Sequence, residues 1–128
     1  MNTPKVLYIE DNRDNFILVK RVLEVEGYQV IEAATGLEGL EKAQNLLPDL
    51  IITDINLPDI DGYDVTTRLK KNPKTTHIPI VAMTANVMKK DRKFVQQVGC
   101  QGFIPKPIDI DALPLQVENF LHGVSNLP

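Results

Sequence analysis

Five short apolar runs alternate with five longer stretches in which apolar residues recur at helical spacing, and this alternation restricts the fold most. The run 50–53, Leu-Ile-Ile-Thr, is apolar almost throughout, which is typical of a strand buried on both faces of a parallel sheet. The stretch 14–26 carries Phe16, Val19 and Leu23 on one side and is followed by Gly27, a common residue just after a helix. Such alternation predicts a parallel sheet covered by helices on both faces.

We therefore predict an α/β fold of five βα units, (βα)5, with right-handed crossovers. Its doubly wound, five-stranded parallel sheet should have the flavodoxin-like order 2-1-3-4-5. Ile17, Leu37, Leu47 and Ile110 are expected among the apolar residues that face the sheet, and the segment 123–128 is expected to be frayed. The predicted strands are 5–9, 28–33, 49–53, 78–83 and 101–104, and the predicted helices are 14–26, 35–47, 63–71, 86–98 and 109–121.

The composition predicts one cytoplasmic domain. The chain has 128 residues, of which 43% are hydrophobic, enough for a real core. No apolar run approaches the roughly 20 residues of a spanning helix, and the start 1–5 has no signal-peptide core. Cys100 is the only cysteine, so an internal disulfide is impossible. The net charge of −3, without a basic run, argues against a large nucleic-acid surface.

Chemically active residues follow four of the predicted strands. Glu10 and Asp11 follow the first strand, Asp54 the third, Thr84 the fourth and Lys106 the fifth. Because parallel strands end at the same edge of a sheet, we expect these side chains to converge there. Three close carboxylates repel one another unless a cation intervenes, and Mg²⁺ suits such a set because it prefers oxygen ligands. The pattern predicts a metal-assisted phosphoryl-transfer site with Asp54 as the nucleophile.

Each of these residues has an ordinary interpretation when it is considered alone. An Asp at a strand end usually caps a loop, a lone Lys is usually solvated, and a Thr at a strand end is common. Only the joint pattern favours a site. Lys106 would then pair with Asp54 or with a phosphoryl oxygen. A cis Lys106–Pro107 peptide bond is expected, since tight functional turns use such bonds.

Four motifs resemble the receiver domain of bacterial two-component response regulators. They are Tyr-Ile-Glu-Asp-Asn from residue 8, Ile-Ile-Thr-Asp-Ile-Asn-Leu-Pro-Asp-Ile-Asp-Gly from residue 51, Val-Ala-Met-Thr-Ala-Asn from residue 81 and Ile-Pro-Lys-Pro-Ile from residue 104. The resemblance covers residues 6–121 and implies a single receiver domain, 1–128, with a core at about 5–121.

The resemblance also implies a role for each site residue. The chain would not be an enzyme but a phosphoacceptor signalling domain, which catalyses only its own phosphorylation and slow dephosphorylation. The implied roles are the phosphoacceptor for Asp54, direct Mg²⁺ ligation for Asp11, ligation through water for Glu10, ligation by the backbone carbonyl for Asn56, phosphate binding for Lys106 and a conformational switch pair for Thr84 and Phe103.

Two side chains depart from common receiver patterns. Asn56 stands where Met is frequent, and Asn86 occupies a position at which the family varies. Both would flank the path of an attacking water and so tune the lifetime of the phosphoryl group.

Other α/β classes fit the motifs less well. A phosphatase of the haloacid-dehalogenase kind needs Asp-x-Asp after its first strand, whereas this chain has Glu10-Asp11-Asn12. A dinucleotide-binding enzyme needs a Gly-rich turn at that point. A flavodoxin needs a hydroxyl- and Gly-rich phosphate loop, and the acidic pair would repel a phosphate. The main alternative is a receiver-like interaction module that binds a partner without being phosphorylated.

The expected partners are proteins. A histidine kinase or histidine phosphotransfer protein would donate the phosphoryl group, and a downstream protein would bind the face of the fourth helix, fifth strand and fifth helix. Direct nucleic-acid binding and membrane binding are not expected, and the protein should be a monomer or a weak dimer. The stretch 84–88 together with 106–108 resembles single-domain DivK-type receivers and equally the receivers of hybrid histidine kinases. The start at Met1 favours the former.

Overall fold

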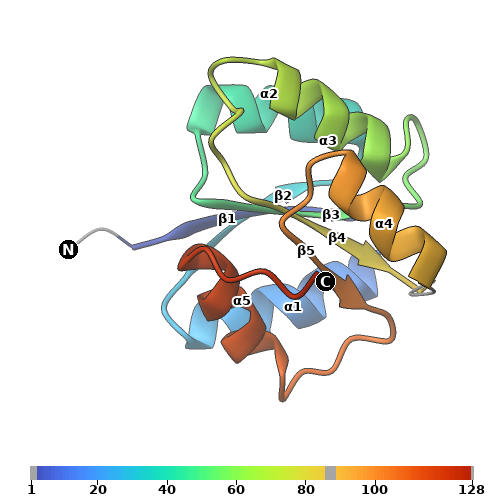
Figure 1. The fold of residues 1–128 in the computed structure, drawn as a ribbon. Helices are drawn as coiled ribbons and strands as arrows, with labels where there is room; N and C mark the ends of the chain where they lie inside the picture. The colour runs from blue at the N-terminus through green and yellow to red at the C-terminus, as the bar shows by residue number, and fades with distance from the viewer. Residues whose placement is uncertain (1–2, 86–88, 128) are drawn as a thin grey trace.

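The fold was derived from a computed structural model, which describes residues 3–85 and 89–127. One parallel sheet with the strand order β2-β1-β3-β4-β5 forms its centre (Figure 1). The predicted α/β class and strand order are therefore confirmed. The strands are β1 (Lys5–Ile9), β2 (Gln29–Ala33), β3 (Leu50–Asp54), β4 (Ile80–Thr84) and β5 (Gly102–Pro105), and the helices are α1 (Arg13–Val25), α2 (Gly36–Leu46), α3 (Gly62–Lys71), α4 (Lys89–Gln97) and α5 (Leu113–Leu121).

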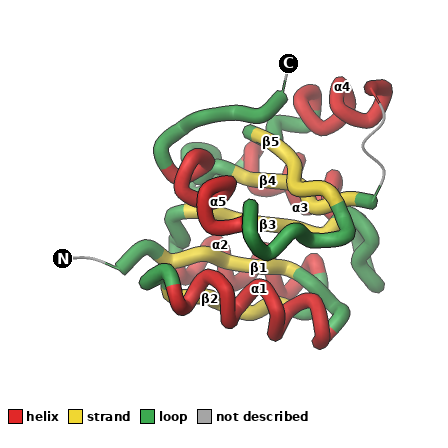
Figure 2. The backbone as a smooth tube through the Cα atoms, turned by 90° about the horizontal axis from the view of Figure 1, so that it is seen from below, coloured by secondary structure: helices red, strands yellow, loops and turns green. Residues whose placement is uncertain are grey.

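Helices cover both faces of the sheet. α1 and α5 lie on one face, and α2, α3 and α4 lie on the other (Figures 1 and 2). Each face has its own buried apolar cluster. One contains Tyr8, Phe16 and Phe120, and the other contains Ile9, Val65 and Val95. All residues of the central strands β3 and β4 are buried, as expected for strands covered on both faces.

Polar side chains fix the starts of three helices. Asn12 accepts a hydrogen bond from the backbone N–H of Asn15 at the start of α1, and Thr35 accepts one from Glu38 at the start of α2. Asp61 does the same for α3. These caps satisfy backbone donors that have no partner inside the helix, so the loops after β1, β2 and β3 enter their helices at defined residues.

The last two helices differ from the prediction. α5 begins at Leu113 rather than at residue 109. Residues 110–112 form a turn before the helix, and the Asp109 carboxylate accepts the backbone N–H groups of Asp111 and Ala112 in this turn. Ile110, in this turn, is 45% exposed and does not face the sheet. α4 is described from Lys89, and the predicted helical residues 86–88 lie outside the described part of the chain.

Three further apolar residues were wrongly expected to face the sheet. Ile17 and Leu37 are exposed on the outer sides of α1 and α2. Leu47 is also exposed, since it follows α2 in a left-handed conformation, with φ of 46°. Phe94 on α4 lies near the surface but packs edge-on against Tyr63 of α3, with 4.5 Å between ring centroids.

The segment 123–127, predicted to be frayed, is instead hydrogen-bonded along the outer edge of β5. The Asn126 amide pairs with both backbone groups of Phe103, accepting from its N–H at 3.0 Å and donating to its carbonyl at 2.7 Å. The Ser125 hydroxyl donates to the carbonyl of Gln101, whose side-chain amide donates to the carbonyl of Val124 at 3.1 Å. Leu127 packs against the cluster on the α4 side of the sheet.

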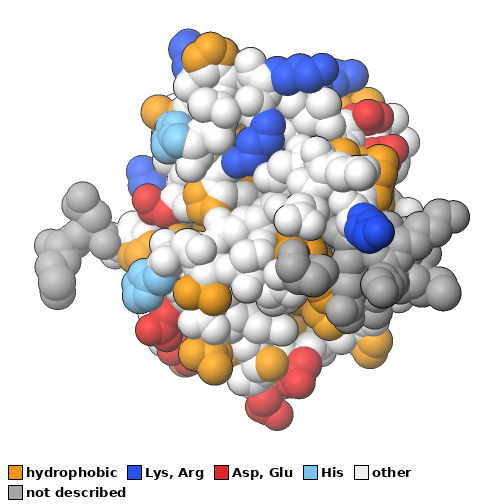
Figure 3. Space-filling model, in the orientation of Figure 1, with side chains coloured by type: hydrophobic (Ala, Val, Ile, Leu, Met, Phe, Trp, Pro, Cys, Tyr) orange, Lys and Arg blue, Asp and Glu red, His pale blue; other side chains and the backbone are white. Residues whose placement is uncertain are grey.

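The surface seen in the orientation of Figure 1 carries charges of both signs. Lys and Arg side chains are concentrated over the upper half of this face, and Asp and Glu side chains are prominent at its bottom (Figure 3). On the described part of this face, uncharged side chains separate the basic ones.

Candidate functional site

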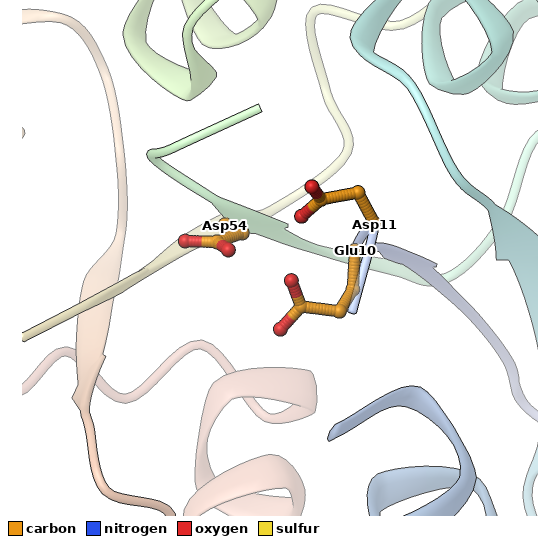
Figure 4. Close-up of side chains that lie close together, drawn as sticks. All are labelled: Glu10, Asp11 and Asp54. Carbon is orange, nitrogen blue, oxygen red and sulfur yellow. The ribbon is translucent and has the colours of Figure 1, made fainter. Parts of the chain in front are cut away.

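Three carboxylates converge at the ends of β1 and β3. Each of Glu10, Asp11 and Asp54 offers an oxygen, and these oxygens all lie within 4.8 Å of one another. Glu10 and Asp11 leave the end of β1 on different sides and both lean toward Asp54 (Figure 4). The parallel pairing of β1 with β3 produces this convergence. Glu10 and Asp54 are buried while Asp11 is exposed, so the cluster opens to solvent on one side.

Lys106 reaches this cluster from the loop after β5. Its Nζ lies 2.9 Å from Oδ2 of Asp54 and 3.3 Å from Oε1 of Glu10. Its backbone N–H donates to the carbonyl of Thr84 at 2.9 Å, and the Lys106–Pro107 peptide bond is cis, as the sequence suggested. Burial alone would lower the pKa of the Lys106 ammonium, but the hydrogen bonds and charges of Asp54 and Glu10 outweigh it and raise that pKa.

The carboxylates still outnumber the ammonium that faces them. Burial raises the pKa of Glu10, and so do the hydrogen bond and charge of Asp54, while Tyr8 and Lys106 oppose the rise. The like charge of Asp54 therefore disfavours the ionised form of the buried Glu10. A hard divalent cation would relieve this repulsion, and the donor set of carboxylate oxygens with one open side fits Mg²⁺.

Glu10 is fixed by two donors that were missed in the sequence. The Tyr8 hydroxyl donates to Oε1 of Glu10 at 2.9 Å, and the Asn15 amide donates to the same oxygen at 3.3 Å. A signal for Tyr8 did exist, because residues two apart on a strand lie on the same face. Asn15 gave no such signal, since its approach depends on how α1 crosses the end of β1.

Asn56 lies beside the candidate acceptor. Its backbone N–H donates to Oδ1 of Asp54 at 3.2 Å, and its side chain is exposed. Thr84, the last residue of β4, and Phe103, in β5, are both largely buried, each at 7% exposure. The site therefore brings together all the residues to which the sequence assigned a role in binding metal or phosphate. Asn86 lies outside the described residues.

The loop from β3 to α3 is tied down at both ends. The N–H of Gly62 donates to the carbonyl of Ile55 at 3.0 Å, and a Cβ at residue 62 would lie 2.3 Å from the backbone oxygen of Asp54. The Asp59 carboxylate accepts the N–H groups of Gly36 and Leu37, both at 2.8 Å. Burial tends to raise the pKa of Asp59, but these hydrogen bonds lower it overall. The sequence had predicted a loop here without either function.

Comparison with known proteins agrees with this geometry. A family model of the response regulator receiver domain matches residues 6–118. The chain belongs to the receiver domain family. It is 39% identical over 119 residues to the polar-differentiation response regulator DivK of Brucella ovis, an alignment that covers 93% of this chain and 97% of DivK.

Solved structures of receiver domains share the fold. The chemotaxis response regulator CheY4 of Vibrio cholerae superposes with a TM-score of 0.89 at 28% identity, covering 93% of this chain and 99% of that one. The receiver domain of a sensor histidine kinase from Pseudomonas aeruginosa PAO1 gives a TM-score of 0.86 at 28% identity, covering 94% and 99%. That structure has a magnesium ion coordinated in its active site cleft.

Family membership establishes the general function. The chain is a signalling domain of the two-component, phosphorelay type, and receiver domains of this family work with histidine kinases and downstream targets. Within residues 3–85 and 89–127, no helix combines the length and apolar character that crossing a bilayer requires.

Proposed function

We propose that Asp54 accepts a phosphoryl group from a histidine kinase or a histidine phosphotransfer protein in a Mg²⁺-dependent reaction. The observation that carries this proposal is the position of Asp54 between two further carboxylates and the ammonium of Lys106. Glu10, Asp11, Asp54 and the backbone carbonyl of Asn56 would hold the ion. The bound ion would supply positive charge for the phosphoryl oxygens and the nucleophile.

The chain's own residues suit each part of the transfer. A carboxylate oxygen of Asp54 forms a bond to phosphorus while the phosphorus–nitrogen bond of the donor phosphohistidine breaks, and the bonding electrons remain on the imidazole nitrogen. Lys106, which pairs with Oδ2 of Asp54, would then bind a phosphoryl oxygen, and the Thr84 hydroxyl would donate to another. The same site would catalyse slow dephosphorylation and no reaction on other substrates.

The output would be a change in the surface formed by α4, β5 and α5. A phosphoryl group adds a charge of about −1.5 to −2 with strong acceptor oxygens, which would draw Thr84 and Lys106 inward and let Phe103 change rotamer. Both conformers would exist beforehand, and phosphorylation would shift their ratio. This surface, with Phe103 and the exposed Lys93, would bind the downstream protein.

We also propose that the chain is one receiver domain, 1–128 with a core at about 5–121, that acts in the cytoplasm as a monomer or weak dimer. The net charge of −3, without a basic run, supports protein partners over direct nucleic-acid binding, which is typical of basic surfaces.

The test is transfer from acetyl phosphate with Mg²⁺, measured by intact mass. We expect one added phosphate on the native chain, loss of the added mass in Asp54→Asn, and normal labelling in Asp111→Asn, which changes an exposed carboxylate in the turn before α5. Asp59 and Asp61 are poor controls because their carboxylates cap α2 and α3. Labelling that survives Asp54→Asn would refute the acceptor. A native chain that takes no phosphate and does not bind beryllofluoride with Mg²⁺ would indicate a non-phosphorylated interaction module.

A further inference from the structure

A tyrosine lies directly beneath the acidic cluster, inside the core. Tyr8 precedes Glu10 by two residues on β1 and has no exposed surface. Its ring stacks on Phe16 of α1, with 5.9 Å between the ring centroids, and its hydroxyl lies 2.9 Å from Oε1 of Glu10 and 3.2 Å from Sδ of Met83. The hydroxyl is therefore a polar group at the end of a ring that packs in the apolar core.

The chemistry of Glu10 and Met83 determines which of them accepts the hydrogen bond from the Tyr8 hydroxyl. A carboxylate is a far stronger acceptor than a thioether sulfur, and a phenol with an ordinary pKa of about 10 is protonated at neutral pH. The Tyr8 hydroxyl therefore donates to Glu10. A buried hydroxyl needs such a partner, so the contact is a constraint on both residues.

The two carboxylate oxygens of Glu10 differ in the number of hydrogen-bond donors around them. Oε1 receives the Tyr8 hydroxyl, the Asn15 amide at 3.3 Å and the Lys106 ammonium at 3.3 Å. Oε2 receives the backbone N–H of Asn12 at 3.5 Å, the upper limit of a hydrogen bond. Oε1, which faces the tyrosine, already has three donors. Oε2 is therefore better placed to accept a hydrogen bond from a water molecule bound to a cation.

We propose that Tyr8 is a positioning residue for the metal site, because its hydroxyl holds Oε1 of Glu10 and so presents Oε2 to the hydration shell of the ion. This inference rests on the proposed function, in which Glu10 ligates Mg²⁺ through water. Of the three donors to Oε1, Lys106 is the one that turns to the phosphoryl group after transfer. Tyr8 is held by the core through its ring, so it keeps Glu10 in place before and after phosphorylation.

Tyr8→Phe tests this directly, since it removes the hydroxyl and retains the ring that packs on Phe16. Mg²⁺ affinity is measured by isothermal titration calorimetry on metal-free protein. We expect the dissociation constant to rise about tenfold, at the lower end of the effects typical of groups that orient a metal ligand. Tyr28→Phe, at a half-buried tyrosine beside β2, is the matched control and should leave the affinity unchanged.

A double-mutant cycle separates positioning from a general loss of stability. In a Glu10→Gln background, Tyr8→Phe should change Mg²⁺ affinity little further, because the carboxylate through which it acts is gone. With acetyl phosphate, Tyr8→Phe should need more Mg²⁺ for half-maximal labelling and reach the native maximum at saturation. A merely structural role would lower the melting temperature without moving the Mg²⁺ requirement.

The outcomes are distinguishable. Native Mg²⁺ affinity in Tyr8→Phe, or an equal loss in the Glu10→Gln background, would overturn the inference and leave the proposed function intact. A native chain that does not bind Mg²⁺ at all would overturn both.

Discussion

At the scale of single residues, the carboxylates of the site repel one another, and a bound cation would reduce this repulsion. Glu10 and Asp54 are buried with exposures of 1% and 3%, and one ammonium, that of Lys106, is shared between them. Anything that binds the folded chain and not the unfolded one adds to its stability, so Mg²⁺ should raise the melting temperature of the native chain. The contribution of Glu10 to this repulsion can be tested by substitution.

The pH dependence of stability should reveal the share of Glu10. Burial and then Asp54 raise the pKa of Glu10 in the folded chain. A carboxyl with a raised folded pKa favours folding below its unfolded pKa, and this contribution is lost as the pH rises through the folded pKa. Without metal, we therefore expect Glu10→Gln to unfold at higher urea than the native chain at neutral pH. The difference should vanish below about pH 4.3, the ordinary pKa of Glu.

The matched control is Glu41→Gln, which removes an exposed carboxylate on α2 and should move the urea midpoint little at either pH. A midpoint for Glu10→Gln below that of the native chain at neutral pH would show that the hydrogen bonds of Glu10 outweigh its repulsion.

At the scale of elements, the end of β3 and the start of α3 are in direct contact. Gly62 is the first residue of α3, and the backbone of Asp54 and Ile55 fills the space that a side chain would need. The candidate acceptor is therefore placed both by its strand and by the helix that follows.

Gly62→Ala should disturb both stability and phosphorylation. Its Cβ would lie 2.3 Å from the backbone oxygen of Asp54, so strand or helix must shift. We expect a loss of about 1–3 kcal/mol in the free energy of unfolding and slower labelling by acetyl phosphate. Gly123→Ala, where φ is 83°, should cost about 1–2 kcal/mol through backbone strain and leave labelling unchanged. Normal labelling in Gly62→Ala would contradict this role.

The sequence was sufficient for the sheet and for the convergence of the acidic residues, because both follow from strand periodicity and parallel topology. The sequence was insufficient for one local feature, the turn before α5, and for two contacts at the site, those of Tyr8 and Gly62. A turn after Asp109 stands where the sequence predicts the start of a helix. The strand pattern assigns Tyr8 no role beyond the core, whereas its hydroxyl donates a hydrogen bond to Glu10. Gly62 directly precedes the predicted helix 63–71, and the close approach of the Asp54 backbone explains why a glycine stands there.

At the scale of the whole molecule, the sheet is closed on its β5 side by side chains of a later segment. Asn126 provides one donor and one acceptor to Phe103, the pairing that a neighbouring strand would supply. Unpaired edge groups are a template for association with other chains, so this segment protects the edge.

Asn126→Ala should open that edge locally. Two hydrogen bonds are lost, each worth about 0.5–1.5 kcal/mol, and the amide of Phe103 should exchange its hydrogen faster than in the native chain. Asn45→Ala, at an exposed position on α2, is the control and should leave that exchange rate unchanged. Exchange is measured by NMR, and an unchanged rate in Asn126→Ala would show that the segment does not protect β5.

The Asp59 contact has a mechanical consequence. The loop that carries Asn56 is fastened to the first turn of α2, a helix from a different βα unit, by two hydrogen bonds of 2.8 Å. A displacement of this loop must either break these two hydrogen bonds or move the start of α2 with it, so the loop is braced by α2. A change at residue 36 or 37, neither of which belongs to the acidic cluster, would therefore be transmitted to the candidate metal site through the brace.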